Sequence, residues 1–396
     1  MKDKKFSPLM FLASLGAGGI TIIPFALLQY TFPHGKGLVK IADIGHANLP
    51  LLKNLFFYSL EGVMLFFTLL HIVLSVIFFK KLIGFIKNTE YKNFINDPLK
   101  NSAIMAPFIS IVMTMNVMIG PIRFFIPEIA ANLQTFMLPA LIFWIFLFIL
   151  HIRMEIKLLK ISFEKGFDVD KISFGWLLHP FALAMLTVTG TGIAAMATSA
   201  SIAHTAAFLS FISGSMGMFL FVVKTISIFK KHFNTEGLGD KQFLPSFLIV
   251  IPNVTLYAIS AFRIGHYLER HHGFHLDSYF LFVIVGAFAF ETWYLLFGIT
   301  LLKDYFKRHH FNKEFFVSQW GLICPFVAYS VLGSFVYSVF LPSPIFYYTV
   351  LFVMIVTIVF YLDLLLRNMR CAGIIKGKIE CDKYSKILYE KIIFTL

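Results

Sequence analysis

The stretch Trp320-Gly-Leu-Ile-Cys324-Pro325-Phe326-Val-Ala-Tyr329 decides the fold, because it is the last of five apolar segments that each carry a proline. The other four are Ile23-Pro24-Phe25-Ala-Leu-Leu, Ala106-Pro107-Phe108-Ile-Ser-Ile, His179-Pro180-Phe181-Ala-Leu-Ala and Ile251-Pro252-Asn253-Val-Thr-Leu. Their prolines lie 83, 73, 72 and 73 residues apart. Self-similarity at a nearly fixed period is the mark of a repeated unit. The spacing therefore predicts a structural repeat of about 73 residues.

The composition is that of a membrane protein. Of the 396 residues, 58% are hydrophobic and 14% are charged, and the mean hydropathy is +0.79. Soluble chains carry about 25% charged residues, and a spanning helix needs about 20 consecutive apolar residues. Apolar runs fall at about residues 8–31, 55–79, 102–122, 134–152, 173–200, 203–223, 243–262, 278–302, 315–341 and 345–366. The sequence therefore predicts an all-α membrane protein with ten transmembrane helices.

The distribution of Lys and Arg predicts the orientation of these helices, since basic residues crowd into cytoplasmic connections. If the N-terminus is cytoplasmic, 28 of the 34 basic residues fall on that side. The other side holds Lys36, Lys40, Lys53, Arg123, Arg263 and Arg270. We expect a cytoplasmic N-terminus (1–7), a ten-helix domain (8–366) and a basic cytoplasmic tail (367–396) in the inner (plasma) membrane. The net charge of +13 is then explained without a nucleic-acid partner.

The repeat prolines all fall on odd-numbered runs: Pro24, Pro107, Pro180, Pro252 and Pro325. The repeat unit is therefore a hairpin of one outward and one returning helix. Hairpins that all enter from one side are related by an axis along the membrane normal. Proline kinks a helix, and the freed carbonyl is tolerated where neighbouring helices or a cavity satisfy it. We expect five hairpins around a quasi-five-fold axis, with the odd helices as an inner ring that forms a pore.

Small residues gather on the same helices, as in Gly16-Ala-Gly-Gly19, Thr189-Gly-Thr-Gly192 and Ala194–Ala200. Small side chains leave room for a lumen, although they also allow helices to pack closely without one. Because the prolines and the small residues coincide on one class of helix, the pattern favours the pore.

The five proline-centred segments on odd helices resemble the tellurite-resistance/dicarboxylate transporter family, which includes bacterial tellurite-resistance channel proteins and the plant guard-cell slow anion channel. The resemblance extends over about residues 6–366. It implies a homotrimer in the lipid bilayer, with a separate pore in each protomer. It also implies conduction of small inorganic or organic anions through five kinked inner helices.

The family's gate is a phenylalanine of the ninth helix in a Trp-x-x-x-Phe-Pro or Trp-x-x-x-Phe-Gly context. The matching residues here are Trp320, Cys324 and Pro325, so the resemblance places Cys324 at the gate. Either the pore is less occluded, or the residues that follow the prolines form a hydrophobic constriction. Those residues are Phe25, Phe108, Phe181, Asn253 and Phe326. The alternative is that the phenylalanines only pack between helices.

Anion selectivity in such a pore needs no dedicated ligand, because hydroxyls, backbone dipoles and positive potential favour anions. The polar residues expected near the lumen are Asn116, Thr187, Thr189, Thr191, Asn253, Thr255 and Ser330. One lysine per repeat lies at the cytoplasmic entrances, where topology alone would also place it: Lys5, Lys100, Lys171, Lys241 and Lys313.

Two ionisable residues within the spans are also compatible with a second function. His179 precedes Pro180 on an inner helix, and Glu291 lies in the middle of the eighth helix. Ionisable groups at membrane depth mark transport pathways and proton relays. The alternative function is therefore a proton-coupled exporter of C4-dicarboxylate, sulfite or tellurite-like oxyanions.

The sequence gives less support to redox-cofactor binding, metal binding or catalysis. A haem- or quinone-binding redox subunit would use His71, His151 and His179, but only one of these lies on an inner helix. His271 and His275 are either a metal-binding pair or part of a solvated loop over 263–275, outside the membrane. No catalytic motif is present, so we expect a non-enzyme without cofactor or metal.

The tail is expected to lie near the lipid surface as a short helix over Lys376–Lys391. The three cysteines, Cys324, Cys371 and Cys381, imply no disulfide framework.

Overall fold

The computed structural model describes residues 6–35, 37–312, 314–377, 379–382 and 384. Within that part of the chain, ten helical spans are long and apolar enough to cross a membrane. They are Pro8–Thr31, Leu51–Ile86, Asn101–Phe125, Leu133–Lys165, Phe174–Met196, Ala200–Asn234, Leu244–His272, Asp277–Leu301, Val317–Phe340 and Pro344–Cys371. The prediction of ten spans is confirmed.

The odd spans are composite helices, whereas the even spans are single α-helices. The even spans are α2 (Leu51–Ile86), α7 (Leu133–Lys165), α9 (Ala200–Asn234), α11 (Asp277–Leu301) and α14 (Pro344–Cys371). The α-helical parts of the odd spans are α1 (Phe11–Thr31), α4 (Met105–Val117), α8 (Leu178–Met196), α10 (Val250–His272) and α13 (Ile323–Phe335). Each of these begins after a 3₁₀ turn: Pro8–Met10, Asn101–Ile104, Phe174–Leu177, Leu244–Ile249 and Val317–Leu322. Wider π turns continue two of them, at Met118–Ile122 before α5 (Arg123–Phe125) and at Val336–Phe340.

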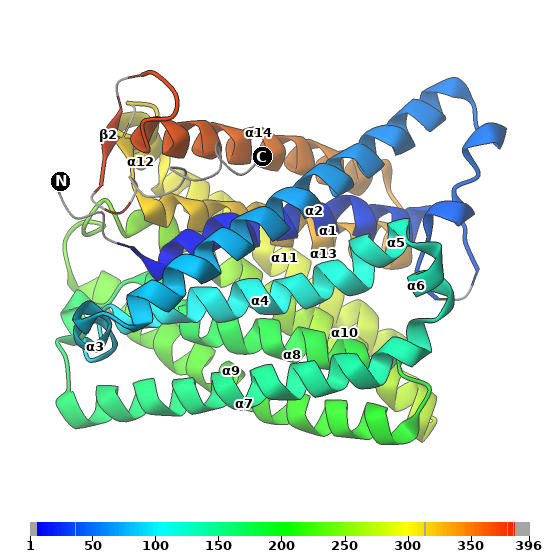
Figure 1. The fold of residues 1–396 in the computed structure, drawn as a ribbon, viewed down its shortest axis with the longest axis horizontal. Coiled ribbons are helices and arrows are strands. Elements are labelled where there is room, and N and C mark those ends of the chain that lie inside the picture. Colours follow the sequence, from blue (N-terminus) through cyan, green and yellow to red (C-terminus); the bar gives the residue numbers. More distant parts are fainter. Residues whose placement is uncertain (1–5, 36, 313, 378, 383, 385–396) are drawn as a thin grey trace.

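Short elements lie in the connections. The α-helical ones are α3 (Thr89–Ile95), α6 (Pro127–Ala131) and α12 (Lys303–Tyr305), the last followed by a π turn at Phe306–His310. The 3₁₀ turns are Ile41–Asp43, His46–Asn48 and Val169–Lys171. In Figure 1, α3, α12 and β2 lie at the end of the bundle where α1 begins, and α5 and α6 lie at the opposite end. We call these the proximal and the distal end.

The spans form two rings. In the most apolar window of each span, 67% to 100% of the residues of odd spans are buried, compared with 28% to 39% for even spans. Along the chain, α1, α4, α8, α10 and α13 contact one another in turn, and α13 contacts α1 again. Each even helix packs against the odd helix that precedes it. Five hairpins around a closed inner ring of odd helices are therefore confirmed.

The outer faces of the even helices are apolar. Large hydrophobic side chains are exposed along them, among them Phe66, Phe146, Phe219, Phe282 and Phe352. In water such a surface would aggregate, whereas in a bilayer it contacts lipid tails of the same character. The exposed faces therefore identify the outer ring as the lipid-facing one.

Four of the five repeat prolines occupy one structural position. Pro107, Pro180, Pro252 and Pro325 are each the third residue of an α segment, directly after the 3₁₀ turn. The first turn of a helix needs no backbone N–H for internal bonding. Proline is therefore accommodated where the 3₁₀ turn passes into the α-helix.

Pro24 does not share this position, because it lies inside α1 and the third residue of α1 is Ala13. The two positions are eleven residues apart along the chain, which corresponds to roughly 16 Å of helix rise. The α segments begin at residues 11, 105, 178, 250 and 323, so the period holds for the last four units only. The first unit is longer because residues 32–50 connect its two helices.

The described part of the C-terminal tail does not form the expected helix. It pairs Glu380–Cys381 (β2) with Glu314–Phe315 (β1) as a two-stranded parallel sheet. A helix over the described part of the tail is therefore wrong, because the chain turns back at Gly373, whose φ of 80° favours glycine. This turn brings Cys381 to Cys371, and the two form a disulfide that sequence spacing did not suggest. The remainder of the expected helix, residues 378, 383 and 385–391, lies outside the described residues.

Candidate functional site

A cavity runs along the axis of the inner ring. Its volume is about 950 Å³, and every one of the five inner helices contributes to its wall. Its proximal limit is formed by Leu15, Met113, Phe181, Pro252 and Cys324, one residue from each inner helix. From there it continues toward the distal ends of the same helices.

The wall residues recur at helical spacing. On α10 they are Pro252, Thr255, Leu256, Ile259, Phe262, Arg263, His266, Glu269 and Arg270. Steps of three and four residues keep side chains on one face of a helix. The cavity therefore follows a single face of α10 over about five turns, from the proximal third of the helix to its distal end.

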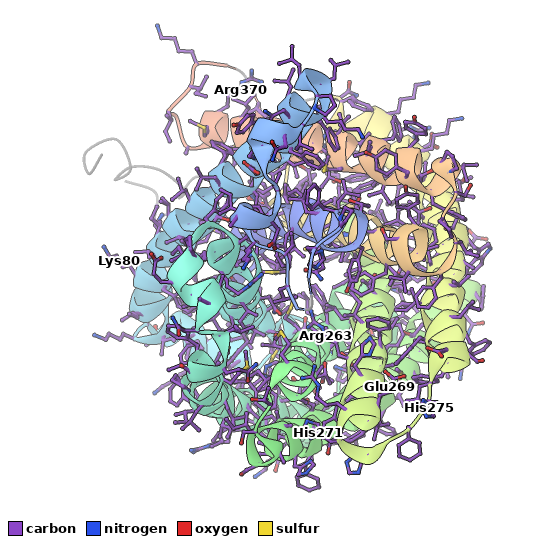
Figure 2. All side chains as sticks on the ribbon, turned by 90° about the vertical axis from the view of Figure 1, so that its right-hand side faces the viewer. Lys80, Arg263, Glu269, His271, His275 and Arg370 are labelled. Atoms are coloured by element: carbon purple, nitrogen blue, oxygen red, sulfur yellow. A yellow bond between two sulfur atoms is a disulfide. The ribbon has the colours of Figure 1, made fainter. Side chains whose placement is uncertain are left out.

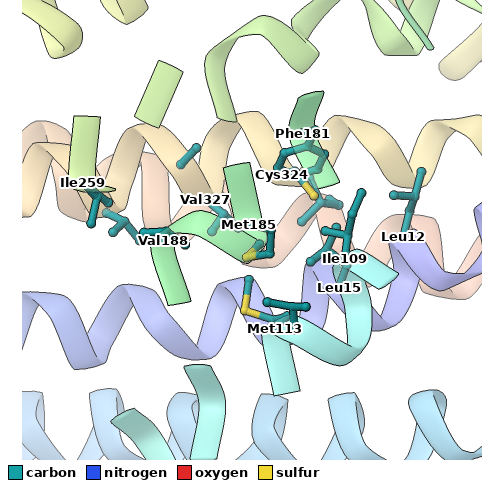
Figure 3. Close-up of a cluster of buried hydrophobic side chains, with 14 of the residues drawn as sticks. Leu12, Leu15, Ile109, Met113, Phe181, Met185, Val188, Ile259, Cys324 and Val327 are labelled. Carbon is teal, nitrogen blue, oxygen red and sulfur yellow. The ribbon is translucent and has the colours of Figure 1, made fainter. Parts of the chain in front are cut away.

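Apolar side chains close the cavity on its proximal side. Leu12 and Ile109 are 5% and 0% exposed and do not line the cavity. Figure 3 shows them in one buried cluster with Phe181 and Cys324, drawn from α1, α4, α8 and α13. Leu12 also approaches the backbone of Gly321 on the facing span, since a Cβ built there would lie 3.7 Å from Leu12 Cδ1. We call Leu12, Ile109, Phe181 and Cys324 the apolar plug.

The predicted gate residues lie at different places. Phe181 and Cys324 line the proximal end of the cavity and belong to the plug. Phe25 also lines the cavity, but further toward the distal end, where its ring lies 3.1 Å from the position of a Cβ at Gly120. This displacement follows from the offset of Pro24 along α1.

Three other predicted pore residues do not line the cavity. Phe108 packs against His151 of α7, with ring centroids 5.1 Å apart. Phe326 packs against Phe360 of α14 at 6.1 Å. Asn253 is fully buried and donates to the carbonyl of Ile249.

Three of the seven polar residues expected near the lumen line the cavity: Asn116, Thr189 and Thr255. Asn116 Nδ2 donates to Thr189 Oγ1 over 2.7 Å, which ties α4 to α8. Thr187 instead bonds Ser213 of α9, and Thr191 bonds the carbonyl of Val188. Ser330 is also absent from the cavity wall.

Glu291 is connected to the cavity through Thr255. The carboxyl group is fully buried on α11, and its Oε1 lies 2.5 Å from Thr255 Oγ1. The hydroxyl also lies 3.2 Å from the carbonyl oxygen of Ile251. No described cation lies within 4.0 Å of this carboxyl group.

His179 faces away from the cavity. Its Nδ1 lies 2.7 Å from Glu155 Oε1 of α7, and both side chains are almost fully buried. Two other histidines, His71 and His151, lie on outer helices. His71 bonds the carbonyl of Ser14 and the hydroxyl of Thr114, and His151 packs on Phe108. The ring nitrogens of His71 and Nδ1 of His179 are thus occupied by protein partners rather than directed at a common ligand site.

The segment 263–275 is a helix over most of its length, so its prediction as a solvated loop is wrong. α10 continues to His272, and Gly273 adopts a φ of 70° where the helix ends. Arg263 therefore lies inside the bundle, on the cavity wall. Its spacing from Pro252, Thr255 and Ile259 places Arg263 on the same face of the helix. This spacing is the feature of the sequence from which its position on the cavity wall could have been predicted.

Arg123 is a second basic residue that the sequence places on the non-cytoplasmic side, and it is buried at the distal end. It is 2% exposed, and it donates to the carbonyls of Ile119 and Val39. These bonds attach the connection after α1 to the third span. Its guanidinium is thus engaged with backbone and does not face the cavity.

The remaining expected residues lie at the periphery. Lys100, Lys171 and Lys241 pair with Asp97, Asp168 and Glu314, whereas Lys5 and Lys313 lie outside the described residues. His271 packs near His204 and Tyr267. Within the described ranges, no group of three or more His, Cys, Asp or Glu side chains is placed to hold a metal ion.

A larger side chain at Cys324 tests the expectation, drawn from the resemblance, that this residue stands in the path of the anions. Its side chain is 8% exposed at the proximal end of the cavity. We expect Cys324→Phe to lower the current roughly tenfold, because an added ring raises the desolvation barrier by about 1.4 kcal/mol or more. Cys324→Ala is the control and should leave the current unchanged. Equal currents from wild type and Cys324→Phe in planar bilayers would remove Cys324 from the passage.

Comparison with known proteins gives one family match. A family model described as voltage-dependent anion channel (SLAC1) matches residues 5–368, which is nearly the whole chain. No curated protein matches the chain.

Proposed function

Because the chain belongs to the voltage-dependent anion channel family (SLAC1), we propose that its cavity is the path along which small anions cross the membrane. The observation that carries this proposal is the closed ring of five inner helices, each of which contributes to the cavity wall. As a member of that family, the chain is a multi-pass anion channel and not an enzyme.

The apolar plug is proposed as the closed gate. Apolar side chains in a narrow lumen exclude water and so block ions without a charged barrier. Phe181 and Cys324 are the predicted gate residues that support this role, since both meet the cavity and belong to the plug. Phe25 would then shape the wider distal half of the path.

The character of the wall supports anions over cations. Hydroxyl and amide groups of Asn116, Thr189 and Thr255 line its middle, and two arginines line its distal half. A positive field in a passage with low-dielectric walls raises the local concentration of anions. Glu269 is the one carboxylate among the described wall residues, and its Oε2 lies 3.0 Å from His266.

The proposal includes the orientation of the channel in the membrane and its oligomeric state. We place the proximal end in the cytoplasm of a cell whose inner (plasma) membrane holds the protein, because most Lys and Arg residues lie at that end. The resemblance implies a homotrimer with one pore in each protomer. Light scattering of the purified protein should then give three times the chain mass of 45.2 kDa.

The alternative function, a proton-coupled exporter, is favoured by one contact, the hydrogen bond between Glu291 and Thr255. Glu291→Gln keeps the shape of the side chain but prevents it from carrying a proton. For a channel we expect the variant to conduct within about twofold of wild type, a change of under about 0.5 kcal/mol. Loss of pH-driven oxyanion uptake in vesicles, with silent bilayer recordings of both proteins, would instead assign a relay to Glu291.

Flux in vesicles separates the two mechanisms. Vesicles that contain the purified protein and KCl are diluted into medium of low chloride, and chloride release is recorded with a chloride electrode. For a channel, valinomycin should start the release, because potassium then balances the charge that leaves. A pH gradient without an ionophore should not replace valinomycin, because it provides no path for the balancing charge. Release that follows the pH gradient and ignores valinomycin would contradict the proposal.

A further inference from the structure

Arg263 is an unusual residue for the distal half of a spanning helix, because even a partly buried cation inside a membrane bundle is costly unless it is paired. It lies on α10 three turns beyond Pro252 and faces the cavity. In Figure 2, which looks at the distal end of the bundle, Arg263 lies near the middle, while Lys80 and Arg370 lie at the periphery. The position alone suggests that its charge is used.

The guanidinium is held in place but is not neutralised. Its Nη1 donates to the carbonyl of Val188 over 2.6 Å, and the same carbonyl accepts from Thr191. No carboxylate oxygen of the described residues lies within 4.0 Å of it. Arginine carries five N–H donors in a planar fork, so most of its donors remain available on the cavity side.

The neighbouring helix α8 provides the space for this arrangement. A Cβ built on Gly192 would lie 3.0 Å from Arg263 Nη1. Any side chain at this position of α8 would therefore press on the guanidinium. The close approach of Gly192 is what allows the arginine to reach the carbonyl of Val188.

Aromatic side chains surround this part of the cavity. Tyr30 of α1 and Phe335 of α13 have ring centroids 4.2 Å apart, and Phe262 of α10 lies 5.5 Å from Phe335. All three line the cavity together with Arg263. We call these three rings the aromatic collar. Electrostatic attraction is stronger beside low-dielectric side chains than in bulk water.

We propose that Arg263 and the aromatic collar form an anion-binding site in the distal half of the pore, which prefers planar oxyanions such as nitrate or formate to halides. This inference rests on the proposed conduction path. A planar fork of N–H donors matches two coplanar oxygens, whereas a chloride ion accepts only as a point charge. Release from the site is possible because a single cation holds the anion.

The test is the permeability ratio of nitrate to chloride, measured as the shift in reversal potential when one anion replaces the other in planar bilayers. Wild type should favour nitrate. Arg263→Lys keeps the charge but cannot bind two oxygens at once, so the ratio should fall roughly tenfold toward unity. Gly192→Ala, which displaces the guanidinium, should shift the ratio in the same direction.

Arg270→Gln is the matched control, because this arginine lies on the same helix and lines the mouth of the same cavity but is exposed. The substitution should lower the current at low ionic strength and have less effect at high ionic strength, where salt screens the lost charge. The nitrate-to-chloride permeability ratio should remain as in wild type. If Arg263→Lys and Gly192→Ala both keep the wild-type ratio in a conducting protein, the site is refuted while the channel stands. A wild-type protein that carries no anion current would refute the conduction path itself, and with it the site.

Discussion

Replacing Phe181 by alanine is expected to raise the anion current at least about tenfold. The ring is 3% exposed and stands where the cavity meets the apolar plug. Removing it leaves room for water at the apolar plug, and a tenfold change corresponds to only about 1.4 kcal/mol of barrier. Currents of wild type and variant should be compared in planar bilayers at equal protein amounts.

Two phenylalanines with the same sequence context provide the controls. Phe108 and Phe326 also follow repeat prolines, but they pack against His151 and Phe360 of the outer ring. Phe108→Ala and Phe326→Ala should therefore keep the wild-type current, apart from losses in protein stability. A rise in current in either control, or none in Phe181→Ala, would contradict the location of the plug.

The second large effect is expected at Gly190, where three helices meet. A Cβ at this position would lie 2.2 Å from Trp144 of α7 and 2.3 Å from Ser210 of α9. Trp144 is fully buried and donates to the carbonyl of Leu186, so it cannot move without losing that bond. We expect Gly190→Ala to lower the free energy of unfolding by about 3 kcal/mol.

Gly286 is the matched control for Gly190. It lies on the exposed face of α11, and a Cβ there would meet nothing within 4 Å. Gly286→Ala should therefore be neutral or slightly stabilising, since alanine favours the helix by about 1 kcal/mol relative to glycine. Thermal unfolding in detergent, followed by circular dichroism, measures both variants. Similar melting temperatures for Gly190→Ala and wild type would show that the packing of α8 is looser than described.

Much of the fold was predictable because a membrane restricts a chain to few solutions. The lipid core demands long apolar helices, and five prolines on alternate runs indicated which helices face inward. The first unit was the exception. Pro24 lies 83 residues before Pro107, about ten more than the other intervals, and it lies well inside α1. Sequence spacing alone does not distinguish a proline in a first turn from one in mid-helix.

Only part of the site was predictable, because the sequence does not show how each inner helix is rotated about its axis. A residue that follows a proline was assumed to point inward, but helix rotation decides this. Phe181 lines the cavity, whereas Phe108 and Phe326 contact the outer ring. Arg263 was missed because charge suggested a loop, although its three-to-four-residue spacing continues the stripe of α10. Cys371 and Cys381 meet because of a turn that the spacing of cysteines does not indicate.

The central claim is that anions cross through the cavity of the inner ring and that the apolar plug limits their passage. The most direct measurement is the reversal potential of the Phe181→Ala channel in a planar bilayer under a gradient of KCl, repeated with a pH gradient. The account predicts a current larger than that of wild type, which reverses near the chloride equilibrium potential and does not shift with pH. A current that reverses near the potassium or proton equilibrium potential would contradict it.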